Sequence, residues 1–373
     1  MTIRIFLFIY LFPIWTITAQ DKPISFSDVG GYKVLVCDAH IHTVFSDGLV
    51  WPTLRVEEGI REGLDVLAFT DHLEYQPHKD DLPRPNINRG YELAKAFAKD
   101  HRILVINGAE VTRSMPPGHL NAIYIQDANA LLKDDPIEVL REASRQGAFI
   151  TWNHPSWPTK EEDGGVHVLE MHQQLIKEGL IHGIEVINGH NYYEDAVALA
   201  LKYNLAMMGN SDVHGPTEWD YQISKGGHRP ATLILAKEKT EESVREALME
   251  RRTIAWFNSL LVGPEKYVSS LVQAIIKVRS AKYQGSAHMG EVTVLSIVLE
   301  NESDVEFILE NASPYSFQQS LETVVLPPRS KMTLFVKTLK KLKEVEIPFL
   351  VKNAVIGVKL HPTWVLKSSV LSP

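Results

Sequence analysis

Two histidines separated by one residue, His40 and His42, stand at the end of a short apolar run near the N-terminal end of the chain. In an extended strand the side chains of residues i and i+2 point to the same face, so both imidazoles are expected to point to one place. The carboxylate of Asp47 follows in a Ser-Asp-Gly sequence. Imidazole and carboxylate groups that converge in this way are ligands for divalent transition metals, and the pattern predicts a metal site.

Other apolar runs that are typical of strands also end at residues able to bind a metal. These residues are His72 after the run 65–70, Glu110 after 103–109, His119 before 120–125, His154 after 148–153, and Asp212 with His214 after 205–211. The carboxyl ends of the strands in a parallel α/β barrel converge on the active site. Together with the first three, these side chains are too many for one ion and suit two or three divalent transition ions, such as Zn²⁺, Mn²⁺ or Fe²⁺.

As a set, these motifs resemble those of the PHP (polymerase and histidinol phosphatase) family of metal-dependent phosphoesterases. They are, in the order of that family, D-x-H-x-H from Asp38, S-D-G from Ser46, F-T-D-H from Phe69, G-A-E from Gly108, W-N-H-P from Trp152 and N-S-D-x-H from Asn210. The resemblance covers about residues 34 to 257. It implies a distorted (βα)7 barrel of the PHP type, with a trinuclear metal centre at its C-terminal face.

The resemblance also implies how the ligands are shared among three ions, with Glu110 bridging two of them. One ion would be held by His40, His42, Glu110 and Asp212, a second by Glu110, His119 and His154, and a third by Asp47, His72 and His214. The expected reaction is hydrolysis of a small phosphomonoester or phosphodiester, with a hydroxide that bridges two ions as the nucleophile.

Two other functions are compatible with parts of this pattern. An amidohydrolase barrel also begins with H-x-H, but the later F-T-D-H and N-S-D-x-H motifs weigh against that class. A non-catalytic metal-binding or ligand-binding module is the other alternative. The complete ligand set weighs against it, because a decayed site would have lost some ligands.

Four further polar residues near the expected strand ends are candidates for roles beside the metals. Asp71 could orient His72, since metal-ligating histidines usually have such a partner, or it could serve as a catalytic proton donor. Asn188 and His190 follow the strand 183–187 and could bind substrate, although Asn-Gly turn chemistry explains them equally well. Arg113 could bind a phosphate oxygen, but a solvated loop arginine is the more common case.

Three tryptophans, Trp152, Trp157 and Trp219, lie near the expected rim of the site. Each could stack on a base or a sugar of the substrate. Packing in the core is nevertheless the default role of any single tryptophan.

The chain of 373 residues is long enough for one large barrel, expected over residues 30–263, and a smaller domain over residues 264–373. Its net charge of −8 and its lack of a basic stripe argue against binding to duplex nucleic acid. A small phosphorylated substrate is still compatible with that charge, because bound metal ions supply positive charge locally.

The first residues resemble a secretory signal peptide. Arg4 precedes an apolar run, Ile5 to Ile17, and small residues end it at Ala19, so we expect removal of residues 1–19. The run is short for a membrane span, so stable membrane insertion after removal of the signal is not expected. The mature protein is therefore expected to be exported, to the periplasm or the outside of the cell.

Helical and strand-like patterns alternate up to about residue 263, which favours a parallel sheet or barrel. Helices are expected at 52–63, 88–100, 136–146, 166–177, 193–203 and 240–251. The segment 268–278 could be helix or strand. Short β-branched segments then follow at 291–299, 305–309, 322–326, 332–336, 345–351 and 354–360, and they predict a small β-sandwich-like domain without catalytic residues.

Overall fold

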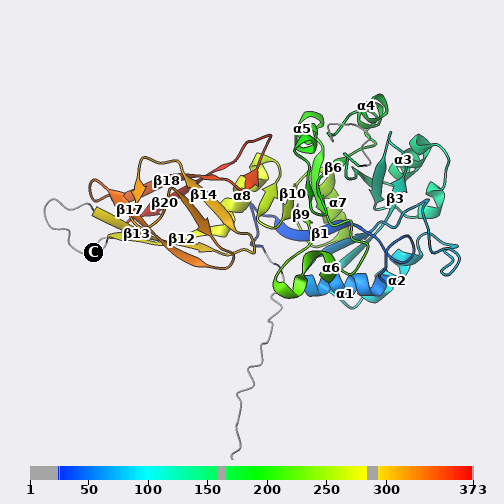
Figure 1. Ribbon diagram of the computed structural model, residues 1–373, viewed down its shortest axis with the longest axis horizontal. Coiled ribbons are helices and arrows are strands. Elements are labelled where there is room, and N and C mark those ends of the chain that lie inside the picture. The colour runs from blue at the N-terminus through cyan, green and yellow to red at the C-terminus, as the bar shows by residue number, and fades with distance from the viewer. Residues whose placement is uncertain (1–23, 25, 158–164, 284–292, 372–373) are drawn as a thin grey trace, which may run out of the picture.

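The computed structural model describes residue 24 and residues 26–157, 165–283 and 293–371. The expected signal peptide, residues 1–19, lies outside the described residues. The described chain forms two lobes, an α/β lobe and an all-β lobe, with the helix α8 (Glu265–Ile275) between them (Figure 1). No described helix is long and apolar enough to cross a membrane.

A curled sheet of 12 described strands forms the α/β lobe. Its strands are β1 (Lys33–Ile41), β2 (Val66–Phe69), β3 (Leu104–Thr112), β4 (His119–Ile123), β5 (Phe149–Trp152), β6 (Gly183–Asn188), β7 (Asn191–Tyr192), β8 (Ala206–Asn210), β9 (Ala231–Ala236), β10 (Thr253–Phe257), β11 (Leu260–Val262) and β19 (Ala354–Val355). The order is β19-β11-β10-β9-β1-β2-β3-β4-β5-β6-β7, with β8 beside β6. The expected distorted barrel with a C-terminal β domain is confirmed.

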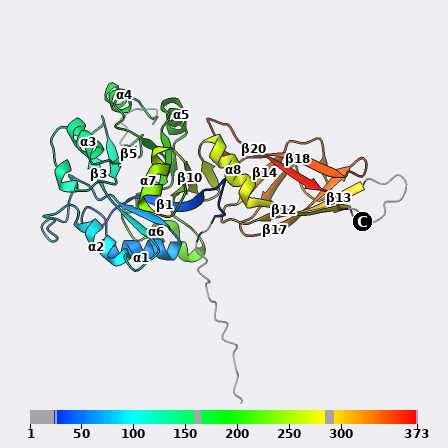
Figure 2. The same cartoon turned by 180° about the vertical axis from the view of Figure 1, so that it is seen from behind.

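Helices lie on the outside of this sheet (Figures 1 and 2). They are α1 (Pro52–Glu62), α2 (Arg89–Ala98), α3 (Pro136–Arg145), α4 (Glu170–Lys177), α5 (Glu194–Tyr203), α6 (Thr217–Tyr221) and α7 (Glu241–Met249), with short 3-10 turns η1 (Ala128–Leu131) and η2 (Ile223–Lys225). Strand β1 is buried along almost its whole length, as expected for a strand covered on both faces.

The barrel is distorted because its strands are not all parallel. Strand pairs β1–β2, β2–β3, β5–β6 and β6–β8 are parallel, whereas β4, β9 and β10 run antiparallel to both of their neighbours. A hairpin therefore joins β3 to β4. It brings His119, at the start of β4, opposite Thr112, two residues after Glu110.

Two antiparallel sheets form the all-β lobe. Their strands are β12 (Ile276–Tyr283), β13 (Thr293–Asn301), β17 (Lys331–Thr338) and β15 (Ser316–Phe317) in one sheet, and β16 (Thr323–Leu326), β14 (Phe307–Asn311), β18 (Glu344–Val351) and β20 (Thr363–Ser369) in the other. Burial alternates along β18, with Val345, Ile347, Phe349 and Val351 inside, so the sheets pack face to face as a sandwich.

The two lobes are joined by strand pairing and side-chain packing as well as by the connecting chain. Strand β19, from the C-terminal region, pairs in parallel with β11 at the edge of the barrel sheet. Asn353 fixes this junction, because its amide nitrogen donates to the carbonyl oxygens of Ser259 and Glu306. One hydrophobic cluster runs from the barrel through Leu271 of α8 to Phe349 in the sandwich. The β lobe therefore packs firmly on the barrel.

Candidate metal centre

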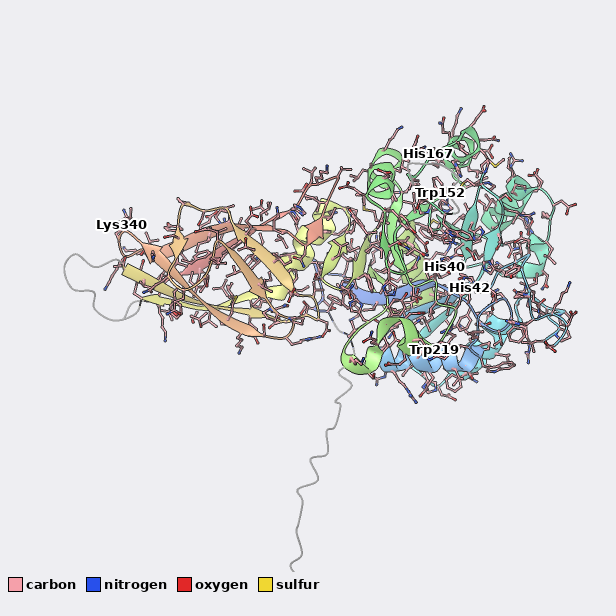
Figure 3. All side chains as sticks on the ribbon, viewed as in Figure 1. His40, His42, Trp152, His167, Trp219 and Lys340 are labelled. Carbon is pink, nitrogen blue, oxygen red and sulfur yellow. The ribbon has the colours of Figure 1, made fainter. Side chains whose placement is uncertain are left out.

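The nine side chains expected to bind metal lie together at one end of the barrel. Most lie at or shortly after the carboxyl end of a strand, whereas His119 begins the antiparallel strand β4 and Asp47 lies on the turn after β1. They fall into four overlapping groups, each with ligand atoms within 4.8 Å of one another. The groups are His42, Asp47, His72 and His214; His40, His42 and Glu110; His40, His154 and Asp212; and His72, Glu110 and His119. Figure 3 shows His40 and His42 inside the barrel, next to each other.

The grouping differs in part from the one that the family resemblance implies. The expected set of Asp47, His72 and His214 is present, with His42 added to it. Asp212 lies 3.1 Å from His40 Nε2 and 3.0 Å from His42 Nε2, as expected, but it also groups with His154. His119 and Glu110, 3.0 Å apart, group with His72. The assignment of each side chain to one ion therefore remains a prediction.

Glu110 is the centre of the arrangement. Its buried carboxylate lies within 3.5 Å of His40, His42, His72 and His154, and one oxygen is 3.0 Å from His119. Burial alone would raise the pKa of Glu110, but the surrounding imidazoles hold that pKa well below its usual value. The carboxylate stays ionised and can bridge two cations.

The imidazoles have unequal electrostatic environments. Burial would lower the pKa of His40, but Asp212, Glu185 and Glu110 outweigh it and hold that pKa well above its usual value. Burial also opposes protonation of His72, yet Asp47 and Glu110 raise its pKa to about 10. Burial lowers the pKa of His42 to about 4. The carboxylates thus favour positive charge in the site. Bound metal ions would supply that charge in place of protons on the imidazoles.

The donor set fits divalent transition ions. His40 Nε2, Asp47 Oδ1 and Glu110 Oε2 are buried, yet they form no hydrogen bond with any residue that the structure describes. Buried polar atoms normally have a partner, and these three belong to the ligand groups. Mixed nitrogen and carboxylate ligands suit Zn²⁺, Mn²⁺ or Fe²⁺ better than Mg²⁺ or Ca²⁺.

Local backbone geometry brings the ligands inward at the strand ends. His154 and Asp212 have positive φ angles of 22° and 54°. Such backbone conformations are rare for residues with a side chain and are concentrated at functional sites. Gly48 of the Ser-Asp-Gly motif lies against His42, since a Cβ at Gly48 would be 2.7 Å from the His42 carbonyl carbon. Only glycine allows the loop that carries Asp47 to pack so closely.

Glu185 is a site residue that the sequence analysis missed. It lies fully buried in β6 and accepts a hydrogen bond from His40 Nδ1 at 2.9 Å. Its other oxygen accepts from the backbone N–H of His154 at 2.7 Å and from Asn188. Glu185 thereby fixes the orientation of His40 with its Nε2 toward the ligand groups. A charged residue within an otherwise apolar strand was the available signal.

Two motif residues hold the strands β1 and β8 together behind the ligands. The buried carboxylate of Asp38 accepts hydrogen bonds from the backbone N–H and the hydroxyl of Ser211, and from Arg229. Asn210 accepts from the N–H of Ala39 and donates to Glu185. The first and last motifs therefore fix each other in space.

Arg55 of α1 joins the loop after β1, which carries His42, to the loop after β8, which carries His214. Its guanidinium donates to the carbonyl oxygens of His42, Val213, His214 and Gly215, at distances between 2.7 and 3.1 Å. It also pairs with Glu58 at 2.8 Å. Arg55 is fully buried, and the sequence analysis did not identify it.

The structure corrects the expected partner of Asp71. Its carboxylate accepts hydrogen bonds from the N–H and hydroxyl of Thr43 and from the hydroxyl of Ser46, each at 2.7 Å. His72 instead lies beside Glu110 and Thr112. Asp71 therefore holds the turn after His42. A role of Asp71 as a catalytic proton donor stays a prediction.

A cavity of about 380 Å³ opens onto the ligand groups. It is lined by Asp47, His72, Glu110, His119, His154, Trp157, Asn188, Asn191, Tyr193, Asp212 and His214. Asn188 thus reaches the cavity, and its role in substrate binding stays a prediction. His190 and Arg113 do not line it: His190 is exposed and packs on Tyr221 and Phe257, and Arg113 pairs with Glu74 at 2.9 Å.

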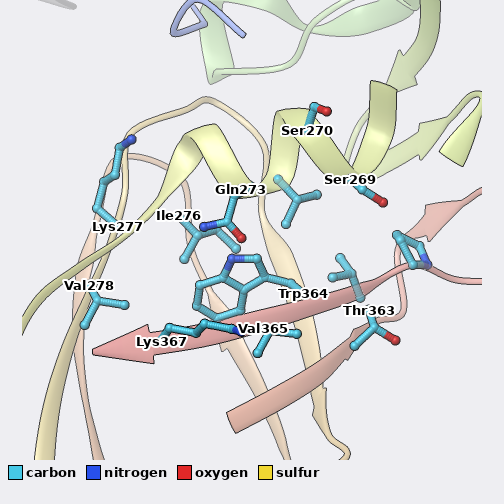
Figure 4. A pocket seen from close by; sticks show the side chains of 13 residues that line it. Ser269, Ser270, Gln273, Ile276, Lys277, Val278, Thr363, Trp364, Val365 and Lys367 are labelled. Carbon is cyan, nitrogen blue, oxygen red and sulfur yellow. The ribbon is translucent and has the colours of Figure 1, made fainter. Parts of the chain in front are cut away.

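A second cavity, of about 680 Å³, lies in the β lobe between α8 and β20 (Figure 4). Gln273, Lys277, Trp364 and Lys367 are among its described lining, which contains no His, Asp or Glu. Its described lining therefore offers no ligand set for a metal. That the C-terminal region carries no catalytic residue stays a prediction.

Comparison with known proteins found matches to both lobes. A family model described as an Ig-like domain matches residues 276–367. The "Uncharacterized protein MJ1295" of Methanocaldococcus jannaschii is 27% identical over 193 residues, 48% of this chain and 82% of that protein.

One solved structure resembles nearly the whole chain. It is a two-domain protein from Bacteroides vulgatus ATCC 8482, described as containing a predicted PHP-like metal-dependent phosphoesterase. Its sequence is 37% identical, the match covers 93% of this chain and 98% of that one, and the TM-score is 0.83. The ligand groups and this relative together support a metal-dependent hydrolase. At this identity and coverage, the chain belongs to the family of PHP-like metal-dependent phosphoesterases.

Proposed function

We propose that the protein is an exported phosphoesterase that hydrolyses a small phosphomonoester or phosphodiester with two or three divalent ions, Zn²⁺, Mn²⁺ or Fe²⁺. The observation that carries the proposal is the cavity of about 380 Å³ beside the ligand groups. Its size suits a small substrate, and every candidate ligand is buried or half-buried. When bound, such ions neutralise phosphoryl oxygens and make water a nucleophile at neutral pH.

The residues of the chain divide this task. Glu110, Asp212 and Asp47, with six histidines, would hold the ions, and Glu185 keeps His40 turned toward them. The Asn188 amide donates to Glu185 and Asp212, so it positions both carboxylates at the cavity wall. Burial and the nearby Glu185 and Asp212 raise the pKa of Tyr193 above its usual value. Its hydroxyl therefore stays protonated and can donate a hydrogen bond to a phosphoryl or leaving-group oxygen.

Metal analysis combined with a substrate panel tests this proposal. We expect two or three transition ions per chain in protein purified without chelator, and hydrolysis of at least one class of phosphomonoester or phosphodiester. Removal of the ions should abolish that hydrolysis, and their return should restore it. Less than one ion per chain would contradict the proposal, and so would hydrolysis of amides with no phosphoester turned over.

Export is a separate part of the proposal. It rests on Arg4, the apolar run up to Ile17 and the small residues that end at Ala19. We expect mature protein isolated from its natural host to begin close to Gln20 and to be found in the periplasm or outside the cell. N-terminal sequencing after cell fractionation measures both. Recovery of Met1 on soluble cytoplasmic protein would contradict export.

A further inference from the structure

The structure separates the three tryptophans that the sequence places near the site. Trp152 is buried and stacks on His172, with ring centroids 4.1 Å apart. Trp219 of α6 is 69% exposed but does not line the metal cavity. Trp157 does line that cavity, and 55% of its surface remains exposed. Only Trp157 can contact a substrate bound at the ligand groups.

Trp157 is fixed directly beside two candidate metal ligands. Its backbone N–H donates to the His154 carbonyl oxygen at 2.8 Å. Its indole packs nearly perpendicular to the rings of His119 and His154, with centroids 5.3 and 5.4 Å away. These contacts hold the indole in place while much of it stays open to a ligand, which reduces the entropy lost when a planar group stacks on it.

Apart from the ligand groups and Trp157, the described part of the cavity wall is polar but uncharged. Asn188, Asn191 and Tyr193 line it beside the ligand groups, and its described lining contains no Lys or Arg. A substrate that carried a second anionic group there would find no cationic side chain among the described lining residues to pair with it. Burying such a charge without a partner is costly. The bound ions are left to neutralise a single phosphoryl group.

We infer that the substrate has an uncharged, planar leaving group, of the nucleoside or aromatic alcohol kind, which stacks on Trp157. Amide and phenol groups of Asn191 and Tyr193 would bind its hydroxyls. This inference rests on the proposed phosphoesterase function and names the substrate class of the same site.

Paired substrates test the stacking contact in the metal-loaded enzyme. Benzyl phosphate and cyclohexylmethyl phosphate have leaving alcohols of similar acidity, but only the first is planar. We expect Trp157→Ala to raise KM for benzyl phosphate about tenfold, the equivalent of about 1.4 kcal/mol, with little change in kcat. The change for cyclohexylmethyl phosphate should be clearly smaller. Trp157→Phe should retain the preference, and the matched control Trp219→Ala should behave as wild type.

A charged substrate tests the second half of the inference. 4-Carboxybenzyl phosphate keeps the planar ring and places an anion away from the phosphoryl group. We expect its kcat/KM to be about tenfold below that of benzyl phosphate, since an unpaired charge costs at least as much as a lost hydrogen bond. Equal turnover of the two would overturn the requirement for an uncharged group.

Binding of a non-hydrolysable analogue separates this inference from the proposed function. Calorimetric titration with benzylphosphonate should show a Kd about tenfold weaker for Trp157→Ala than for wild type and Trp219→Ala. If the wild type binds benzylphosphonate in this way but turns over no phosphoester, the proposed function fails and the inferred stacking site stands. If Trp157→Ala binds the analogue as tightly as wild type, the inference fails whatever the activity.

Discussion

Replacement of Asp212 by asparagine is expected to lower kcat/KM for phosphoester hydrolysis by about 1,000-fold. Metal ions lower the activation free energy of such reactions by several kcal/mol, and each loss of about 1.4 kcal/mol slows the reaction tenfold. One Asp212 oxygen lies 3.1 Å from His40 Nε2 and 3.0 Å from His42 Nε2. Asparagine keeps the size of the side chain but removes its charge from the ligand group that Asp212 forms with His40 and His154. The fold should persist, because Asp212 contributes no packing to the hydrophobic core.

Steady-state kinetics and metal content of the Asp212→Asn variant measure this effect together. His101→Ala is the matched control, because His101 is exposed on the turn after α2 and its ring stacks on Phe97, with ring centroids 4.9 Å apart. It should retain wild-type activity and wild-type metal content. A loss in the control as large as that in Asp212→Asn would show that the strand-end histidines and carboxylates are not the source of activity.

Replacement of Arg55 by methionine is expected to lower the free energy of unfolding by about 3 kcal/mol or more, because removing one member of a buried, hydrogen-bonded charged group leaves its partners unsatisfied. Arg55 donates to four carbonyl oxygens on the loops that carry His42 and His214. Methionine fills similar space but donates no hydrogen bond. The two loops should separate, so metal affinity should fall together with stability.

Denaturant unfolding of metal-free and metal-loaded protein measures both consequences. Arg61→Met, on the same helix, is the matched control, since its side chain is 72% exposed and pairs only with Glu57. Exposed pairs of this kind contribute about 0.5 kcal/mol. If the two variants lost the same stability, the carbonyl network around Arg55 would not be what holds the ligand loops.

The ligand set followed from local sequence because most of the ligands stand at or directly after the end of a strand. Alternation along β1 directs His40 and His42 to one face whatever the rest of the chain does. The runs before His72, Glu110, His154 and Asp212 are apolar because parallel strands are covered on both faces. Convergence of nine side chains then follows from the barrel, and the structure brings all nine together.

The sequence predicted that the C-terminal lobe is a β-sandwich, but not the bounds and pairing of all its strands. Alternating β-branched residues indicated a sandwich, and the structure has two antiparallel sheets. The segment 268–278, ambiguous in sequence, divides between helix α8 and strand β12. The strand expected at 354–360 is only Ala354–Val355, and it pairs with the barrel strand β11, while β20 (Thr363–Ser369) was not expected. The pairing of Leu261 with Ala354 joins residues 93 apart in the sequence. It depends on which sheet edge is free, and no local pattern records that.

Only the tertiary structure decided which hydrogen-bond and ion-pair partners the polar side chains around the site have. Arg113 pairs with Glu74, and Asp71 with the turn at Thr43, because those groups lie closest once the strands are in place. Glu185 and Arg55, buried in β6 and α1, support the ligands from other elements. The sequence by itself determined which residues can bind metal, since that depends on side-chain chemistry and strand alternation. Which groups orient those residues depends on distances between elements, and burial makes those contacts strong only after the chain has folded.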